Sequence, residues 1–263
     1  MNKIIFFINC HVNKQYDSLL NLYLNDFKNS SIEHRKDVKL IMVIVGKPED
    51  YLKIRKYTEI TLPGMFNDYE EKNILTSSTT ERIEFRVFDN SRYEHVGIET
   101  VWSEAMASND NDLITYTHCR GLGHQSPNHL EMNGSREVFS FYAASHIIRN
   151  YKDVEKIHKD NPQVTKVGLG QSPGGWMWFN FWTCKASYLK TRTKPDVDGT
   201  LTPMMKKHFD RWVQDRHYYE AWLGDDGKSN DQGYSLLLRN HIGATISGPM
   251  IIAAIRKLSG RMF

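Results

Sequence analysis

The chain has 263 residues, a formal net charge of +3 and 25% charged residues, which is enough length for one large α/β domain or two small ones. Lys and Arg are spread along the whole chain, and this argues against a nucleic-acid-binding surface. Three widely spaced cysteines, Cys10, Cys119 and Cys184, do not make a disulfide framework. They favour a reducing, cytoplasmic setting.

Two apolar segments raise the question of membrane contact. The opening MNKIIFFINC lacks a small-residue cleavage site, which favours a buried strand over a signal peptide. The run GPMIIAAI, residues 248–255, is much shorter than the roughly 20 residues that span a bilayer. With Arg256, Lys257 and Arg261 behind it, this run could rest on the cytosolic face of a membrane. Packing of the run on the protein core is the favoured interpretation.

The hydrophobic pattern predicts alternating strands and helices in the first half of the chain. In chain order we expect a strand at 3–9, a helix at 16–27, strands at 38–46 and 83–90, a helix at 93–108 and a strand at 112–117. This alternation is typical of an α/β fold whose mainly parallel, doubly wound sheet carries helices on both faces.

From residue 135 onwards the pattern changes. A helical stretch at 135–151 is followed by the aromatic-rich run GGWMWFNFWTCKASYL at 174–189. No repeat and no low-complexity linker divides the chain, so we expect one domain over residues 1–263. Its second half would be a helical and aromatic-rich elaboration that covers the strand ends.

Two D-x-D triplets, at 110–112 and 196–198, are candidates for holding a metal and a diphosphate. A metal-binding D-x-D belongs at the carboxyl end of a strand. The first triplet precedes its strand and is rejected, whereas the second lies in a loop with Pro and Gly that is more typical of a turn. His118, His124 and His129 lack the paired spacing of structural zinc ligands. The sequence therefore predicts no metal site.

The strand at 112–117 runs directly into His118, Arg120, Gly121 and Gly123. Ligands in α/β sheets usually bind at the carboxyl ends of strands. Arginine matches a diphosphate with bidentate, charge-assisted hydrogen bonds, and glycine lets the backbone approach a ligand closely. The alternative is a His and an Arg on an ordinary surface loop, and the residues alone leave both interpretations open.

The aromatic-rich run also has two interpretations. Trp176, Trp178 and Asn180 suit a wall on which the apolar face of a sugar stacks. The same aromatic side chains are equally typical of a protein core.

A carboxylate lies in the third candidate stretch, RWVQDRHYYEAWLGDD at 211–226. Glu220 has Tyr219 and Trp222 close to it in sequence, and partial desolvation there can raise the pKa of a carboxyl group and make it a base. The alternative is a structural carboxylate paired with Arg211 or Arg216.

These stretches, in this order, resemble a family of bacterial and viral GT-A-like glycosyltransferases. DLITYTHCRGLG resembles the family's Y-I-H-S/T-K-G segment, WMWFNFWTCKASYLK its G-N-F-W-W-A-K/R-A-S-Y segment, and RHYYEAWLG its R-Y/F-x-x-E-x-W-L-G segment. The helix YEHVGIETVWSEA also fits, and the match covers most of residues 3–224. The chain departs from the family in having Arg120 for Lys, Phe179 for Gly, and Thr183-Cys184 for Trp-Ala.

The resemblance implies a GT-A-like fold and transfer of a sugar from a nucleotide-sugar to a glycan or lipid-linked acceptor. Residues 1–134 would bind the nucleotide-sugar, and residues 135–263 would form the acceptor side. The implied roles are as follows: Asn9, Cys10, His11, Asp89 and Asn90 line the nucleoside pocket, His118, Arg120 and Gly121 hold the diphosphate, Trp176, Trp178 and Asn180 face the sugar or acceptor, and Glu220 is the base of an inverting reaction.

No cofactor beyond the donor is firmly implied. Mn²⁺ or Mg²⁺ is not favoured, because His118 and Arg120 occupy the place where ordinary GT-A enzymes carry their D-x-D, and fixed cations can neutralise a departing diphosphate as a metal does. The alternative function is a non-catalytic carbohydrate-binding module with the same aromatic wall. Such a module would not bind nucleotides.

Overall fold

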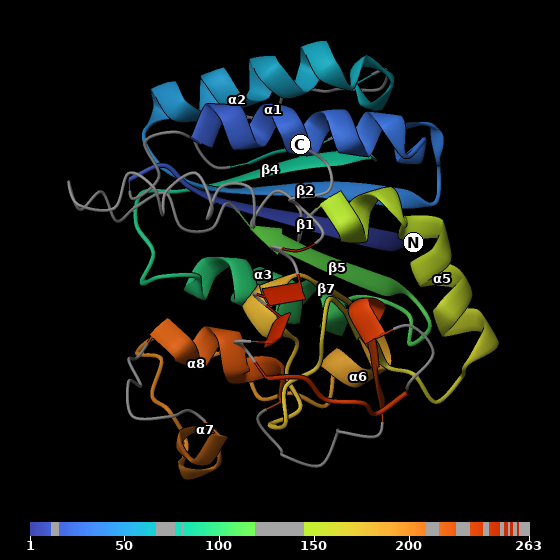
Figure 1. The fold of residues 1–263 in the computed structure, drawn as a ribbon. Helices are drawn as coiled ribbons and strands as arrows, with labels where there is room; N and C mark the ends of the chain where they lie inside the picture. The colour runs from blue at the N-terminus through green and yellow to red at the C-terminus, as the bar shows by residue number, and fades with distance from the viewer. Residues whose placement is uncertain are drawn as a thin grey trace.

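The computed structural model describes residues 1–11, 16–66, 77–79, 82–118, 145–208, 216–224, 232–238 and 242–247, with single positions 250, 251, 253, 254 and 257. This part of the chain forms an eight-stranded mixed sheet with helices on both faces (Figure 1). The strands are β1 Asn2–Asn9, β2 Val38–Val45, β3 Ser77–Thr79, β4 Ile83–Phe88, β5 Leu113–His118, β6 Lys166–Gly168, β7 Trp182–Lys185 and β8 Gly233–Ser235.

The helices among the described residues are α1 Tyr16–Asn29, α2 Pro48–Thr61, α3 His95–Met106, α5 Tyr151–Asp160, α6 Ala186–Leu189, α7 Pro203–His208 and α8 Arg216–Ala221. Short 3₁₀ turns are η1 Ile32–His34, η2 Pro63–Met65, η4 Trp178–Asn180, η5 Trp222–Gly224 and η7 Leu236–Leu238.

Four neighbouring strands, β4, β2, β1 and β5, are all parallel. The chain builds outward from β1 to β2 and β4 on one side and then places β5 on the other side of β1. The direction of winding therefore changes between β1 and β5. In an open α/β sheet, such a switch point opens a crevice at the carboxyl ends of the two strands.

The second half of the chain continues this sheet. β7 lies antiparallel to β5, with Tyr116 opposite Trp182, and β6 follows antiparallel to β7. The hydroxyls of Thr115 and Thr183 are 2.8 Å apart across the β5–β7 pair. The prediction of a mainly parallel sheet thus holds for the first half, whereas part of the aromatic-rich run, expected only to cover strand ends, is a strand.

Alternating side chains of the central strands face two separate cores. Ile4, Phe6 and Ile8 of β1 pack towards α1 and α2, and Ile5 and Phe7 pack towards α3 and α6. Figure 1 shows these helices as two layers on opposite faces of the sheet. All five side chains are at most 4% exposed, and full burial of such a residue contributes about 1.5–3 kcal/mol.

The predicted strands at 3–9, 38–46, 83–90 and 112–117 and the helices at 16–27 and 93–108 correspond to β1, β2, β4, β5, α1 and α3. The helix expected at 135–151 lies partly outside the described residues. The sequence analysis missed α2, which has Pro48 in its first turn and buries Tyr51, Ile54 and Thr58. That spacing of three and four residues is a helical signal.

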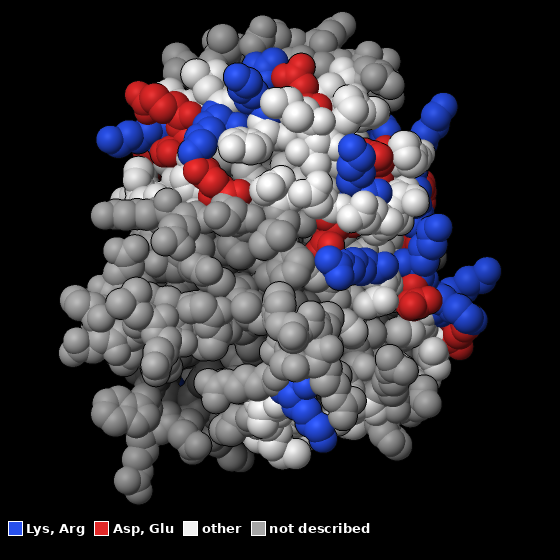
Figure 2. Space-filling model, turned by 45° about the horizontal axis from the view of Figure 1, so that its top comes forward, with Lys and Arg blue, Asp and Glu red and all other residues white. Residues whose placement is uncertain are grey.

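Two observations concern the partners that the sequence analysis considered, nucleic acid and a membrane. Figure 2 shows one face, where most of the described Lys and Arg side chains lie beside Asp and Glu rather than in a patch of one sign. Within the described residues, no helix is both long and apolar enough to cross a membrane. In the C-terminal run GPMIIAAI, Ile251 is fully buried against the α1/α2 core, whereas Met250 is 61% exposed.

Candidate functional site

The loops after β1 and β4 meet at the carboxyl edge of the sheet. The Nε2 of His11 donates to the backbone oxygen of Asp89 over 2.9 Å, because a carbonyl can only accept. The backbone N–H of His11 donates to Asn9 Oδ1 at 3.1 Å. Asp89 and Asn90 are exposed, and Asn9 is buried. The structure therefore brings these four of the predicted nucleoside-site residues to one edge of the sheet.

His118, the last residue of β5, is a buried side chain at this edge. Its Nε2 donates to the carbonyl oxygen of Phe179 over 2.9 Å, and its Nδ1 lies 3.5 Å from Glu94 Oε1. The ring is 3% exposed and stacks on Phe181 at a centroid distance of 4.7 Å. A direct contact between His118 and a diphosphate would require the ring to be uncovered and one of its nitrogens to leave its present neighbour, Phe179 or Glu94.

Glu94 connects the predicted segments. It precedes α3, and its Oε2 accepts hydrogen bonds from Asn180 Nδ2 at 2.9 Å and from the Tyr116 hydroxyl at 3.3 Å. Its other carboxylate oxygen faces His118. The carboxylate is 19% exposed. Burial and the nearby Glu94 carboxylate raise the pKa of Tyr116 well above its ordinary value.

Phe179 and Asn180 form a strained turn. Both have left-handed backbone conformations, with φ of 67° and 55°, which a bulky side chain such as phenylalanine rarely adopts. The Asn180 amide donates to Glu94 and to the carbonyl of Tyr219 at 3.1 Å. Such strain persists only where surrounding contacts fix the backbone, and it is commonest at functional sites. Phe179 stands where the resembling family has glycine, the residue that suits this conformation.

The aromatic wall is mainly core. Trp176 is 1% exposed and Asn180 is 1% exposed, so neither presents its side chain to solvent. Trp178 is half-buried, and its indole N–H donates to the carbonyl of Ile246 over 2.6 Å. Of the three predicted sugar-facing residues, Trp178 is the one with an accessible side chain.

The third predicted segment joins the same cluster through α8. The Tyr219 ring packs edge-on against His95 at 6.1 Å, and its hydroxyl donates to the carbonyl of Val197 over 2.9 Å. Glu220, the predicted base, is half-buried on α8 between buried neighbours. The three segments that resemble the glycosyltransferase family thus meet around Glu94. His118 and Asn180 face its carboxylate, and Tyr219 joins them through the carbonyl that accepts from Asn180.

The two D-x-D triplets lie at opposite edges. Asp110 pairs with Lys190 over 2.7 Å in the turn before β5, at the amino edge. In the second triplet, Asp196 Oδ1 and Oδ2 accept from the backbone N–H groups of Asp198 and Thr200, and these bonds lower the pKa of Asp196. This is the turn that the sequence analysis favoured.

Asp198 reaches the carboxyl edge, where it pairs with Arg92 over 3.0 Å. No cluster of three or more His, Cys, Asp and Glu side chains suited to a metal ion occurs among the described residues. Arg120 and Gly121, the other predicted diphosphate ligands, lie outside the part of the chain that the structure describes.

No family model, curated protein or solved structure matches this chain. The function therefore has to be argued from the arrangement of its own residues.

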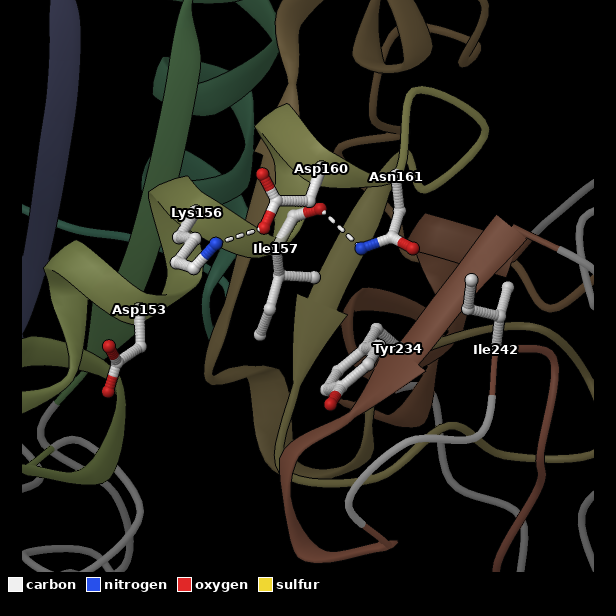
Figure 3. A pocket seen from close by; sticks show the side chains of 7 residues that line it. All are labelled: Asp153, Lys156, Ile157, Asp160, Asn161, Tyr234 and Ile242. Carbon is white, nitrogen blue, oxygen red and sulfur yellow. Dashed lines mark hydrogen bonds and ion pairs between the residues drawn. The ribbon is translucent and has the colours of Figure 1, made fainter.

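A separate cavity of about 380 Å³ lies between α5 and the outer strand β8 (Figure 3). It is lined by Asp153, Lys156, Ile157, Asp160, Asn161, Tyr234 and Ile242. Asp160 and Asn161 precede β6, whose register with β7 and β5 sets them at the amino edge of the sheet. None of the predicted site residues lines this cavity. The ammonium group of Lys156, one of the lining residues, is paired with Asp160.

The sequence analysis missed Glu94 as a site residue. A signal was present, because Glu94 begins the segment that leads into α3 and follows a strand whose carboxyl end shares the edge with His118. A carboxylate at such a turn can be solvated, can cap the helix or can reach inward, and sequence does not decide between these.

Proposed function

We propose that this chain is a GT-A-like glycosyltransferase that moves a sugar from a nucleotide-sugar donor to a glycan or lipid-linked acceptor. The observation that carries the proposal is the carboxyl edge of the parallel strands, where a 2.9 Å hydrogen bond between His11 and Asp89 joins the loop after β1 to the loop after β4. Polar side chains from two strand-end loops meet there, and the carboxyl ends of the strands are where α/β sheets bind nucleotides.

In this proposal the nucleoside lies over the edge formed by His11, Asp89 and Asn90. The diphosphate is held by Arg120 and Gly121, on the segment that leaves β5. His118 positions this segment. Its two ring nitrogens face Phe179 and Glu94, and these contacts fix where the segment leaves the sheet.

The acceptor side of the proposal uses two elements of the second half. Trp178 offers an accessible aromatic face for a sugar. Glu220 is the base that takes the proton from the acceptor hydroxyl if the reaction inverts configuration. The contact cluster around Glu94 keeps both elements in a fixed relation to β5.

Thermal unfolding with UDP-, GDP-, CDP- and dTDP-sugars, each with and without Mn²⁺, tests the proposal. A ligand at 100 times its Kd stabilises the folded state by about 2.7 kcal/mol, so one donor class should raise the Tm, and it should do so without metal. The proposal fails if none of these donors raises the Tm.

The alternative, a non-catalytic carbohydrate-binding module, is favoured by Trp178, since a half-buried aromatic ring can stack on sugars. It predicts that oligosaccharides raise the Tm and that nucleotide-sugars do not, so the same experiment separates the two functions.

A further inference from the structure

The loop between β4 and α3 holds an exposed aromatic residue in an uncommon backbone conformation. Tyr93 has φ of 52°, in the left-handed region, and its side chain is 48% exposed. No ring or cation contact of its side chain occurs among the described residues. Backbone strain is commonest at functional sites, and the exposed face of an aromatic ring can stack on a flat ligand, so this residue is a candidate ligand contact.

The conformation of Tyr93 is fixed from both sides. The hydroxyl of Ser91 donates to the carbonyl of Tyr93 over 3.3 Å and accepts from the N–H of Val96 at 3.3 Å. On the other side, Glu94 turns inward and is held by Asn180 and Tyr116. The left-handed residue is therefore the point at which the chain turns from solvent into the buried cluster. Because the backbone of Tyr93 is held in this way, only the torsions of its side chain have to be ordered when the ring binds a ligand.

The neighbours of Tyr93 indicate which part of a nucleotide would lie on it. The same loop begins with Asp89 and Asn90, both exposed, at the edge where His11 bridges to Asp89. Arg92 pairs with Asp198 over 3.0 Å. The exposed carboxylate of Asp89 disfavours phosphate beside it. The carboxylate of Asp89 and the amide of Asn90 instead suit the hydroxyls of a ribose and the polar edge of a base.

We propose that the Tyr93 ring is the platform on which the nucleobase of a nucleoside diphosphate stacks. The proposal rests on the proposed function, because it assumes a nucleotide at this edge, and it adds a residue and a contact that determine affinity for the base. Every nucleobase has a flat π face, so stacking on tyrosine contributes affinity with little selectivity for the base. Selectivity between bases then depends on Asp89 and Asn90, which would contact the polar edge of the base.

Two variants separate the ring from the backbone. Tyr93→Phe keeps the aromatic face, and Tyr93→Asn removes it while supplying a residue that tolerates the left-handed conformation. Binding of UDP, GDP, CDP and dTDP is measured by calorimetry for the parent protein and both variants, with inorganic pyrophosphate as a probe that lacks a base. The Tm of Tyr93→Asn, which is expected to equal or exceed that of the parent, shows that the variant is folded.

We expect Tyr93→Asn to weaken the best nucleotide by about tenfold or more, which is within the range measured for base–aromatic stacking. Tyr93→Phe should keep the parent affinity, and pyrophosphate should bind all three proteins equally. Equal nucleotide affinity in the parent and Tyr93→Asn overturns the inference alone. A matching loss of pyrophosphate affinity also overturns it, because the effect is then not on the base. If the folded parent binds none of the four nucleotides, the proposed function itself fails.

Discussion

Glu94 and Asn180 are 86 residues apart in the chain and are joined by a 2.9 Å hydrogen bond from the Asn180 amide to the carboxylate. This bond ties the turn before α3 to the strained turn before β7. Because Tyr116 of β5 donates to the same carboxylate, β5 and the turn before β7 share one acceptor, and His118 at the end of β5 faces it. The geometry of the carboxyl edge therefore depends on this side chain.

Glu94→Ala should lower the free energy of unfolding by about 1–3 kcal/mol, since it leaves buried donors on Asn180 and Tyr116 without their acceptor. Urea denaturation measures the change. The matched control is Glu99→Ala, one turn further along α3, which breaks the 3.0 Å pair between Glu99 and Lys194. Such a pair with a 60% exposed lysine is worth at most about 1 kcal/mol. Equal losses in the two variants would contradict a central role for Glu94.

Two substitutions of Asn180 test the strain at its turn. Asn180→Ala and Asn180→Gly remove the same amide hydrogen bonds, but alanine is disfavoured at φ of 55° and glycine is not. We expect the Gly variant to be more stable than the Ala variant by about 1 kcal/mol or more, measured by urea denaturation. The reverse order, which is normal inside a helix, would show that the left-handed conformation is not kept.

The parallel half of the fold is predictable from sequence because its signals are local. β1 and β2 contain the apolar runs at residues 4–8 and 40–45, β5 is a short β-prone stretch, and α1 and α3 have helical spacing. β7 is not predictable in this way, since an aromatic run is equally typical of a strand, a core loop and a sugar-binding wall. Only pairing with β5 decides between them, and pairing is a long-range property.

The predicted site residues divide along similar lines. Strand order places Asn9, His11 and Asp89 at one edge, and this follows from parallel strands alone. Burial does not follow from strand order. His118 and Trp176, to which the resemblance gives ligand-binding roles, are 3% and 1% exposed. Their burial depends on segments that reach them only in the folded chain.

His158 on α5 predicts a loss of stability in mild acid. Burial lowers the pKa of this residue from its ordinary 6.5 to about 4. Between these values the unfolded chain binds a proton that the folded chain does not. The free energy of unfolding is therefore unaffected by His158 above pH 6.5 and falls as the pH drops from 6.5 to 4. The total loss is about 3 kcal/mol.

Urea denaturation between pH 4 and 7 measures this slope. His158→Gln, whose amide can still donate to the Val164 carbonyl that His158 contacts at 3.2 Å, should have a slope lower by up to about 1.4 kcal/mol per pH unit. His34→Gln, at a histidine with a 73% exposed side chain, is the control and should keep the parent slope. Parallel slopes for His158→Gln and the parent would show that folding does not lower the pKa of His158.

Glu220→Gln tests the acceptor side of the proposed glycosyl transfer, once the donor class is known from thermal unfolding. An inverting transfer needs a base to take the proton from the acceptor hydroxyl as it attacks the anomeric carbon. The amide keeps the shape of the half-buried side chain on α8 and removes the base, so turnover should fall by about a hundredfold or more, with the Tm and donor affinity nearly unchanged. Glu99→Gln is the matched control and should keep the parent turnover. Proton NMR of the product should show an inverted anomeric centre. A Glu220→Gln protein that transfers sugar at the parent rate, or a product with retained configuration, would contradict the assignment of Glu220 as the base.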